Sequence, residues 1–161
     1  MFKENDYVVY KKDVCKIKEI KNKNENRYYI LNPIDDDSLI IDVPIDNKMG
    51  FLRKIISKEE ANNLIDNIIN IMPLDDIDDK NIENKYKTLL LEGTHENFVK
   101  VIKTTYLRNE KRIKNNKKIS EKDDTFFKKA EKYLYNELSI SLNMTIPEVK
   151  DYIYKKIQDN M

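Results

Sequence analysis

The first 56 residues alternate between short apolar runs and polar turns. Residues 6–10 and 14–20 are rich in β-branched and aromatic side chains, and the second run alternates apolar with charged residues. A period of two is typical of a half-buried strand, and the short polar link between the runs favours antiparallel pairing. Similar runs follow at residues 27–32, 38–44 and 49–56. Because no helical pattern separates them, they predict a small, strongly bent antiparallel sheet or barrel.

From Ser57 the apolar residues recur at helical spacing instead. Ser57 and Glu60 have the spacing of a capping box, and the helix that they begin is expected to end before Pro73. An acidic link at residues 74–79 is the predicted domain boundary. Further helices are expected over residues 81–91 and after the capping residues Thr94, Ser120 and Thr145. The chain is therefore predicted to be α+β, with an all-α C-terminal domain of about four to five helices.

The predicted organisation has three parts. Residues 1–56 form the β domain, residues 57–79 are a helix and an acidic linker, and residues 80–161 form the helical domain. No apolar run reaches the roughly 18 to 20 residues that span a bilayer, and the N-terminus lacks the apolar core of a signal peptide. We therefore expect a cytoplasmic protein without a membrane partner. Cys15 lies in a strand pattern and is expected to be a buried, inert thiol.

Charge is divided unevenly, although the net charge is only +1 and 37% of the residues are charged. Residues 57–79 carry one basic and seven acidic residues, whereas residues 80–132 carry fifteen and eight. This asymmetry indicates an anionic partner for the helical part. Between residues 98 and 118 the basic side chains, expected to point largely outward, are Lys100, Lys103, Arg108, Lys111, Arg112, Lys114, Lys117 and Lys118. Such a face can neutralise phosphates; the alternatives are a solvated helix face and the lysine-rich, glycine-poor composition typical of AT-rich genomes.

Catalytic patterns are scarce in this sequence. Two glycines leave no phosphate-cradling loop, and no serine lies in a nucleophile elbow. His95, the single histidine, falls in the first turn of a predicted helix without a second histidine or cysteine nearby, so we expect an exposed side chain rather than a metal ligand. We therefore predict that the protein is not an enzyme and needs no cofactor or metal, and that it acts by binding.

Several motifs, in this order, resemble the CarD/CdnL family of bacterial RNA polymerase-binding transcription regulators. The opening is similar to the family block F-x-x-G-D-x-V-V-Y-x-x-x-G-V, and residues 52–57 resemble G-L-R-x-I-I/V-S. The C-terminal half adds the similar segments Lys85-Tyr86-Lys87, Glu92-Gly93, Val101-Ile102-Lys103 and Leu134-Tyr135-Asn136-Glu137-Leu138. The N-terminal part also resembles the polymerase-binding module of the transcription-repair coupling translocase.

The resemblance implies a Tudor/SH3-like β barrel that docks on the polymerase β subunit. It also implies a helical domain that contacts promoter DNA at the upstream edge of the bubble and stabilises the open complex. The family's docking strand and turn map onto Lys21, Arg27, Ile40, Ile41 and Asp42. Its DNA contacts, together with nearby basic residues, map onto Ile82, Lys85, Tyr86, Lys87, Lys117, Lys118 and Lys122. A monomer is expected.

The chain departs from the family pattern at several positions. Asn5 and Asp13 replace glycines, and both residue types tolerate positive φ. Asp42 stands where many relatives carry a basic residue. There is no tryptophan, and Ile82 occupies the position of the residue that relatives insert into the minor groove, so a weaker apolar wedge is expected. An alternative follows: a polymerase-binding adaptor whose helical domain binds another protein rather than DNA.

Overall fold

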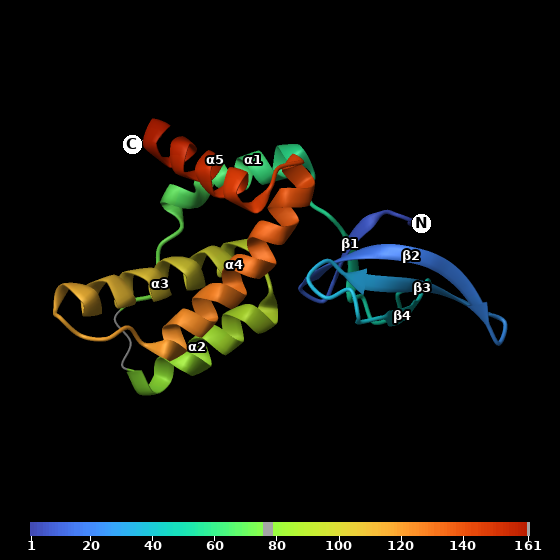
Figure 1. Ribbon diagram of the computed structural model, residues 1–161, viewed down its shortest axis with the longest axis horizontal. Coiled ribbons are helices and arrows are strands. Elements are labelled where there is room, and N and C mark those ends of the chain that lie inside the picture. Colours follow the sequence, from blue (N-terminus) through green and yellow to red (C-terminus); the bar gives the residue numbers. More distant parts are fainter. Residues whose placement is uncertain (76–78, 161) are drawn as a thin grey trace. The chain divides into compact units, whose positions relative to one another are not determined.

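The computed structural model describes residues 1–75 and 79–160. The chain divides into two compact units, Met1–Ile56 and Ser57–Met161, and each has a core of its own. The first unit contains the strands and the second contains the helices (Figure 1). The α+β class predicted from the sequence is therefore confirmed.

The first unit is a five-stranded antiparallel sheet with strand order β4-β3-β2-β1-β5. Its strands are β1 (Tyr7–Tyr10), β2 (Asp13–Lys23), β3 (Asn26–Pro33), β4 (Ile41–Pro44) and β5 (Leu52–Lys54). Strands β2 and β3 form the longest pair, with a register shift between Ile17 and Glu19 that bends the sheet. β4 and β5 lie at the two edges. The strand pairing is therefore that of an open, bent sheet rather than a closed ring of strands.

Left-handed backbone at the turns explains how the strands connect. Asn24 and Glu25 have φ of +48° and +70° and join β2 to β3 as a two-residue hairpin, so the strands extend further into the turn than predicted. Asn5 takes φ of +71°, as its place in the motif predicts. At the second replaced glycine the prediction is wrong: Asp13 begins β2, and Lys11 has the positive φ, at +58°. The turn lies within the predicted link, and its left-handed residue is two positions before Asp13.

The core of the sheet unit consists of apolar residues from all five strands. Its buried members are Val8, Cys15, Ile17, Tyr29, Leu31, Val43 and Leu52. Cys15 is buried as predicted, and burial, with a smaller contribution from Asp13, raises the pKa of its thiol to about 12. A thiol with so high a pKa stays protonated near neutral pH and is a poor nucleophile.

The second unit contains five α-helices and one 3-10 turn among the described residues. They are α1 (Lys58–Asn67), η1 (Ile68–Asn70), α2 (Asp79–Glu92), α3 (His95–Lys114), α4 (Glu121–Leu142) and α5 (Ile146–Asp159). Ser57, Thr94, Ser120 and Thr145 each accept a hydrogen bond from the first turn of the helix that follows. The four predicted caps are therefore confirmed, because a hydroxyl before an apolar stripe satisfies an N–H that the helix leaves unpaired.

Helix α1 belongs to this helical unit and not to a linker between domains. Ala61 and Ile65 are buried, the helix contacts both α4 and α5, and Tyr152 of α5 donates a hydrogen bond to Asn62 at 2.5 Å. Figure 1 shows α1 and α5 side by side near one end of α4. The structure thus divides the chain at residue 56, whereas the sequence analysis separated residues 57–79 as a helix and linker. Residues 76–78 of the predicted acidic link lie outside the described residues.

Candidate functional site

The first candidate surface is the open edge of the sheet at β4. This strand pairs with β3 on one side, and among the described residues no strand pairs with its other side. The N–H of Ile45 donates to the carbonyl of Arg27 at 3.1 Å, and in the same register Val43 faces Tyr29. Hydrogen-bonded positions alternate along an antiparallel pair, so the N–H and C=O of Asp42 point to the open side.

The residues around Asp42 make this edge suitable for an added strand. Pro44 has the same phase as Asp42, so its missing N–H removes no hydrogen bond to β3. Leu39 and Ile40, just before the strand, are 46% and 51% exposed. An incoming strand would therefore find unpaired backbone groups at Asp42 and two apolar side chains next to them.

The charged side chains near the edge are arranged differently from the predicted set. Asp42 pairs with Lys23, whose Nζ lies 2.5 Å from Oδ2, and this hydrogen bond raises the pKa of Lys23. Lys21 instead contacts Glu19 at 3.2 Å, and Arg27 is exposed near the tip of the β2–β3 hairpin. Lys23 was not among the predicted residues. Its place in a lysine-rich turn gave no indication that it would reach a strand nineteen residues later.

A groove of about 310 Å³ opens beside the same strand. Its walls include Tyr10, Val43, Pro44, Met49 and Phe51. Met49 is 74% exposed and Phe51 42% exposed, and Nζ of Lys11 lies 5.2 Å from the centroid of the Phe51 ring. Neither of these two apolar residues was predicted to belong to a binding site. The signal in the sequence was their position on either side of Gly50, a residue typical of turns, and its φ of +71° confirms the turn.

Two residues predicted to contact DNA lie in the core of the helical unit instead. Ile82 is 1% exposed, and Tyr86 is completely buried. The Tyr86 hydroxyl donates to Oδ1 of Asp123 at 2.9 Å, and its ring packs 5.1 Å from that of Phe126. Ile82 and Tyr86 lie one helical turn apart on the buried face of α2, and Leu90 lies on the same face. The predicted roles of Ile82 as a wedge and Tyr86 as a DNA contact do not fit this structure, because a buried side chain cannot enter a groove.

The five remaining predicted DNA-binding residues are exposed lysines. Lys87 of α2 and Lys122 of α4 both approach Glu83, at 3.4 and 3.5 Å, and they lower its pKa, Lys87 more strongly. Lys85 is exposed on α2, and Lys117 and Lys118 lie in the connection between α3 and α4. The structure thus brings Lys87 and Lys122 together. Exposed pairs of this kind contribute little to stability, so the lysines can exchange Glu83 for a phosphate at small cost.

The basic face of α3 is only partly directed outward. Lys103 points inward and donates to the carbonyls of Ile68 and Ile71 at 2.5 and 2.7 Å, and burial lowers its pKa. The prediction that Lys103 faces outward is therefore wrong, because the carbonyls at the end of η1 need donors. Arg108 and Arg112, one turn apart, contact the carboxylate of Asp79 at the start of α2. The cationic surface is thus concentrated near the C-terminal end of α3.

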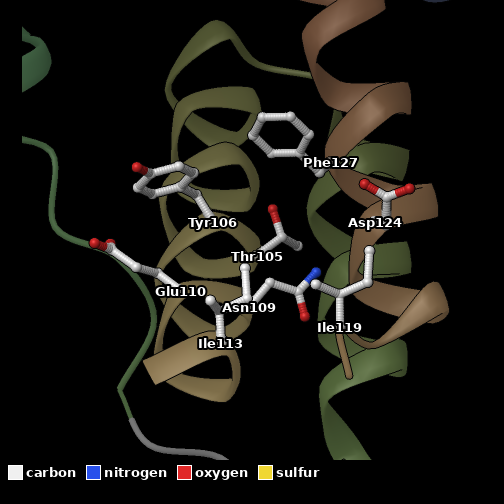
Figure 2. Close-up of a pocket in the computed structure, with 8 residues that line it drawn as sticks. All are labelled: Thr105, Tyr106, Asn109, Glu110, Ile113, Ile119, Asp124 and Phe127. Atoms are coloured by element: carbon white, nitrogen blue, oxygen red, sulfur yellow. The ribbon is translucent and has the colours of Figure 1, made fainter. Parts of the chain in front are cut away.

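A second groove, of about 200 Å³, lies between α3 and α4. Figure 2 shows Tyr106 and Ile113 on α3 opposite Phe127 and Ile119, with Glu110 at one margin and Asp124 at another. Tyr106 is 56% exposed, although it is aromatic. A groove with an apolar floor and few polar groups is suited to an apolar side chain of a partner.

His95 is not the exposed residue that the sequence indicated. Its Nε2 lies 2.8 Å from Oε1 of Glu137, a carboxylate buried in α4. The histidine is therefore a partner for a buried acidic group. Within the described ranges no group of three or more His, Cys, Asp or Glu residues is placed to hold a metal ion. No helix in these ranges is long and apolar enough to cross a membrane.

A small bent sheet with an open edge and an adjoining apolar groove defines a protein-interaction module. Residues 2–56 match the family model described as the CarD-like/TRCF RID domain. No curated protein matches the chain. The family is one of protein-interaction domains and not of catalysts, and it indicates a transcription-related role with RNA polymerase as the partner of the first unit.

Proposed function

We propose that the protein is a transcription regulator that binds the β subunit of bacterial RNA polymerase through the β4 edge and promoter DNA through its helical unit. The observation that carries the proposal is the match of residues 2–56 to a polymerase-interacting domain whose β4 edge has unpaired backbone groups at Asp42. Main-chain pairing supplies affinity, and the exposed Ile40 and the neighbouring groove supply specificity. Ile41 is half-buried and packs against the core of the sheet unit, so it supports the strand from within. Lys21, Lys23 and Arg27 are the nearby cations that orient the partner.

The DNA contact rests on the exposed cations of the helical unit. Lys85, Lys87 and Lys122 come from α2 and α4, and Lys117 and Lys118 from the connection before α4. Side chains of this kind bind phosphates at any sequence and release counterions, so the contact depends on salt. Held to polymerase by the first unit, such a surface stabilises the open complex by contacting the backbone at the upstream edge of the bubble. The apolar wedge is no longer part of this mechanism.

The polymerase contact is tested by two substitutions at one position. Asp42→Pro removes the outward N–H while keeping the β3 hydrogen bonds, as Pro44 already does. Asp42→Ala keeps that N–H and removes only the contact with Lys23. We expect the proline variant to lose about tenfold or more in affinity for the isolated β subunit, and the alanine variant about threefold or less, at unchanged melting temperatures. Equal losses for both variants would exclude strand addition at this edge.

The whole function is tested by the lifetime of the open complex. The cognate polymerase is assembled on an AT-rich promoter with and without the protein at two salt concentrations. A longer lifetime that shortens as salt rises is expected from phosphate contacts. If polymerase binds the protein and the lifetime is unchanged, the DNA half of the proposal is wrong.

A second candidate is a polymerase-binding adaptor whose helical unit binds another protein. The groove between α3 and α4 favours it, because Tyr106, Ile113 and Ile119 are exposed apolar residues next to one another (Figure 2). Tyr106→Ser would then abolish partner binding without changing the salt dependence of the open complex. The DNA-binding proposal expects the same variant to keep its effect on lifetime.

A further inference from the structure

A shallow hollow of about 210 Å³ lies at the C-terminal end of α3, and we call it the α3 hollow. It is lined by Asp79, Arg108, Lys111, Arg112, Asn115 and Lys117. The first three basic residues lie at i, i+3 and i+4 on one face of the helix. Lys117 joins them because Asn116 takes a left-handed φ of +57° and the N–H of Lys117 turns back to the carbonyl of Arg112 at 2.8 Å. Four cations therefore surround one small space.

One of these cations is held in place from below. Nε of Arg108 donates to Oδ2 of Asp123 at 3.0 Å, and the other oxygen of Asp123 accepts from the Tyr86 hydroxyl at 2.9 Å. Asp123 is buried at 1% exposure, so this contact fixes the plane of the guanidinium. Nη2 of Arg108 is directed to Asp79, which lines the hollow. A guanidinium held in this way loses less conformational entropy when it binds an oxyanion.

The described residues that line the α3 hollow include one carboxylate, Asp79. Its two oxygens contact Nη2 of Arg108 and, at 3.4 Å, Nη2 of Arg112. Planar guanidinium groups bind carboxylate and phosphate through the same geometry. The Asp79 side chain is 71% exposed, so water reaches it, and the hydrogen bond from Arg108 lowers its pKa. Asp79 is an oxyanion, and it contacts the two arginines that a bound phosphate would contact.

We propose that the α3 hollow binds a backbone phosphodiester group of DNA, and that Asp79 is an internal competitor that holds the two arginines when no phosphate is bound. The site adds Arg108, Lys111 and Arg112 to the lysines named above, and it rests on the proposed contact of the helical unit with DNA. Asp79 reduces the affinity for isolated DNA. Only when polymerase raises the local concentration of promoter DNA does the phosphate displace the carboxylate.

The test compares two isosteric substitutions that make the same change in net charge. Asp79→Asn removes the competitor, and Asp151→Asn removes an exposed carboxylate of α5 that pairs with Lys155 at 3.1 Å. Binding of the full chain to a short AT-rich duplex is measured by fluorescence anisotropy over a salt series. We expect D79N to raise affinity about two- to fivefold and D151N to change it less than twofold, since exposed ion pairs are weak. Equal gains would show a general charge effect and overturn the proposal.

A double variant assigns the gain to the arginines. Arg112→Gln should lower the affinity for DNA and reduce the slope of log affinity against log salt by about 0.9, the value for one phosphate contact. In the R112Q background D79N should gain less than it does alone. A full gain in both backgrounds would mean that Asp79 does not act on Arg112, and the proposal would be wrong.

Inorganic phosphate distinguishes failure of this site from failure of the proposed function. The Nε–H signals of Arg108 and Arg112 are followed by NMR while phosphate is added to the wild-type chain and to D79N. Saturation at a lower phosphate concentration in D79N supports the site even if no duplex binds, and the DNA proposal alone would then fail. If the arginine signals do not respond in either chain, the site itself is wrong, whatever the DNA result.

Discussion

In the proposed function, the sheet unit and the helical unit present different parts of the chain to a partner. At β4 the contact groups are main-chain N–H and C=O, placed on the surface because a strand at the edge of a sheet has no second neighbour. On α2, α3 and the connection to α4 they are the ends of long basic side chains. The first kind of contact depends on register, and the second depends on charge and on salt.

If strand addition at β4 is correct, it accounts for Asp42 at a position where the resemblance implies a basic residue. The backbone at Asp42 points to the open edge whatever the side chain is, and the carboxylate is neutralised by Lys23 within the chain. In the helical unit the proposed contact is made by the side chains themselves. A basic side chain that turns inward is therefore no longer available to bind phosphate. Lys103 is an example. The proposal therefore predicts that the sheet edge tolerates changes of sequence that the basic surface does not.

The largest effect is expected from Ile82→Ala, which tests whether this residue belongs to the core or to the surface. Removing a fully buried isoleucine side chain to the β-carbon should lower the free energy of unfolding of the helical unit by about 3 kcal/mol. Urea unfolding followed by helical circular dichroism measures it. Chemical labelling of the Cys15 thiol reports on the core of the sheet unit, and its rate should be the same in I82A as in the wild-type chain.

A matched variant separates stability from binding at this position. Ile82→Val should cost about 1 kcal/mol and keep the affinity for duplex DNA. A valine variant that is stable and yet loses DNA binding would support a role for Ile82 as an apolar wedge in DNA. It would contradict the view that the helical unit contacts DNA only through basic side chains.

Asp123→Ala should have the next largest effect. It leaves the Tyr86 hydroxyl without its acceptor and Arg108 without its buried carboxylate, so a loss of about 3 kcal/mol or somewhat less is expected. The control is the neighbouring Asp124→Ala, which breaks a pair with Lys128 at 2.9 Å on the surface and should cost less than about 1 kcal/mol. Similar losses for the two variants would mean that the buried network does not organise the basic surface.

Lys103→Met measures how much an inward-pointing cation contributes to the free energy of unfolding. Methionine keeps most of the apolar stem, but the carbonyls of Ile68 and Ile71 lose a donor, and a cost of about 1 to 2 kcal/mol follows. Lys100→Met, which breaks a pair with Glu96 at 3.9 Å, should cost less than about 0.5 kcal/mol. Thermal melts check both. DNA affinity should fall more for K100M than for K103M, and the reverse order would place Lys103 on the binding surface.

The smallest effect concerns Glu131 and depends on pH. Burial raises the pKa of this carboxyl, against an opposing effect of Lys150. The folded state therefore favours the protonated form: this stabilisation is fully present below the unfolded pKa and is lost as pH rises through the folded pKa. Glu131→Gln should be nearly neutral at pH 4 and raise stability by a few tenths of a kcal/mol at pH 7. A destabilised variant at pH 7 would show that the contact with Lys150 outweighs burial.

Much of the fold could be predicted because it is written in local patterns. Period-two alternation located the strands, and Ser57, Thr94, Ser120 and Thr145 located four helix starts, since each cap needs only the residues of its own first turn. The resemblance to the family pattern indicated β4 as the docking strand. These predictions use information within a few residues of each element.

The site in the helical unit could not be predicted in the same way. Whether Ile82 faces solvent depends on where α3 and α4 pack against α2, and an apolar residue in an amphipathic helix has the same local pattern in either case. Lys103, Tyr106 and Arg108 also lie in one continuous pattern on α3. In the structure Lys103 points inward, Arg108 contacts Asp123 and Asp79, and Tyr106 points outward. The partners of Lys103 and Arg108 lie 15 to 35 residues away along the chain, and periodicity carries no information about them.

Turns in this chain rely on asparagine more than on glycine. Five asparagines, Asn5, Asn24, Asn47, Asn116 and Asn143, have left-handed backbone, and the whole sequence contains two glycines. Asparagine codons begin with two adenines and glycine codons with two guanines. An asparagine whose short amide tolerates positive φ thus lets the gene change its nucleotide content without moving a turn. The five asparagines thus make left-handed turns without a glycine codon.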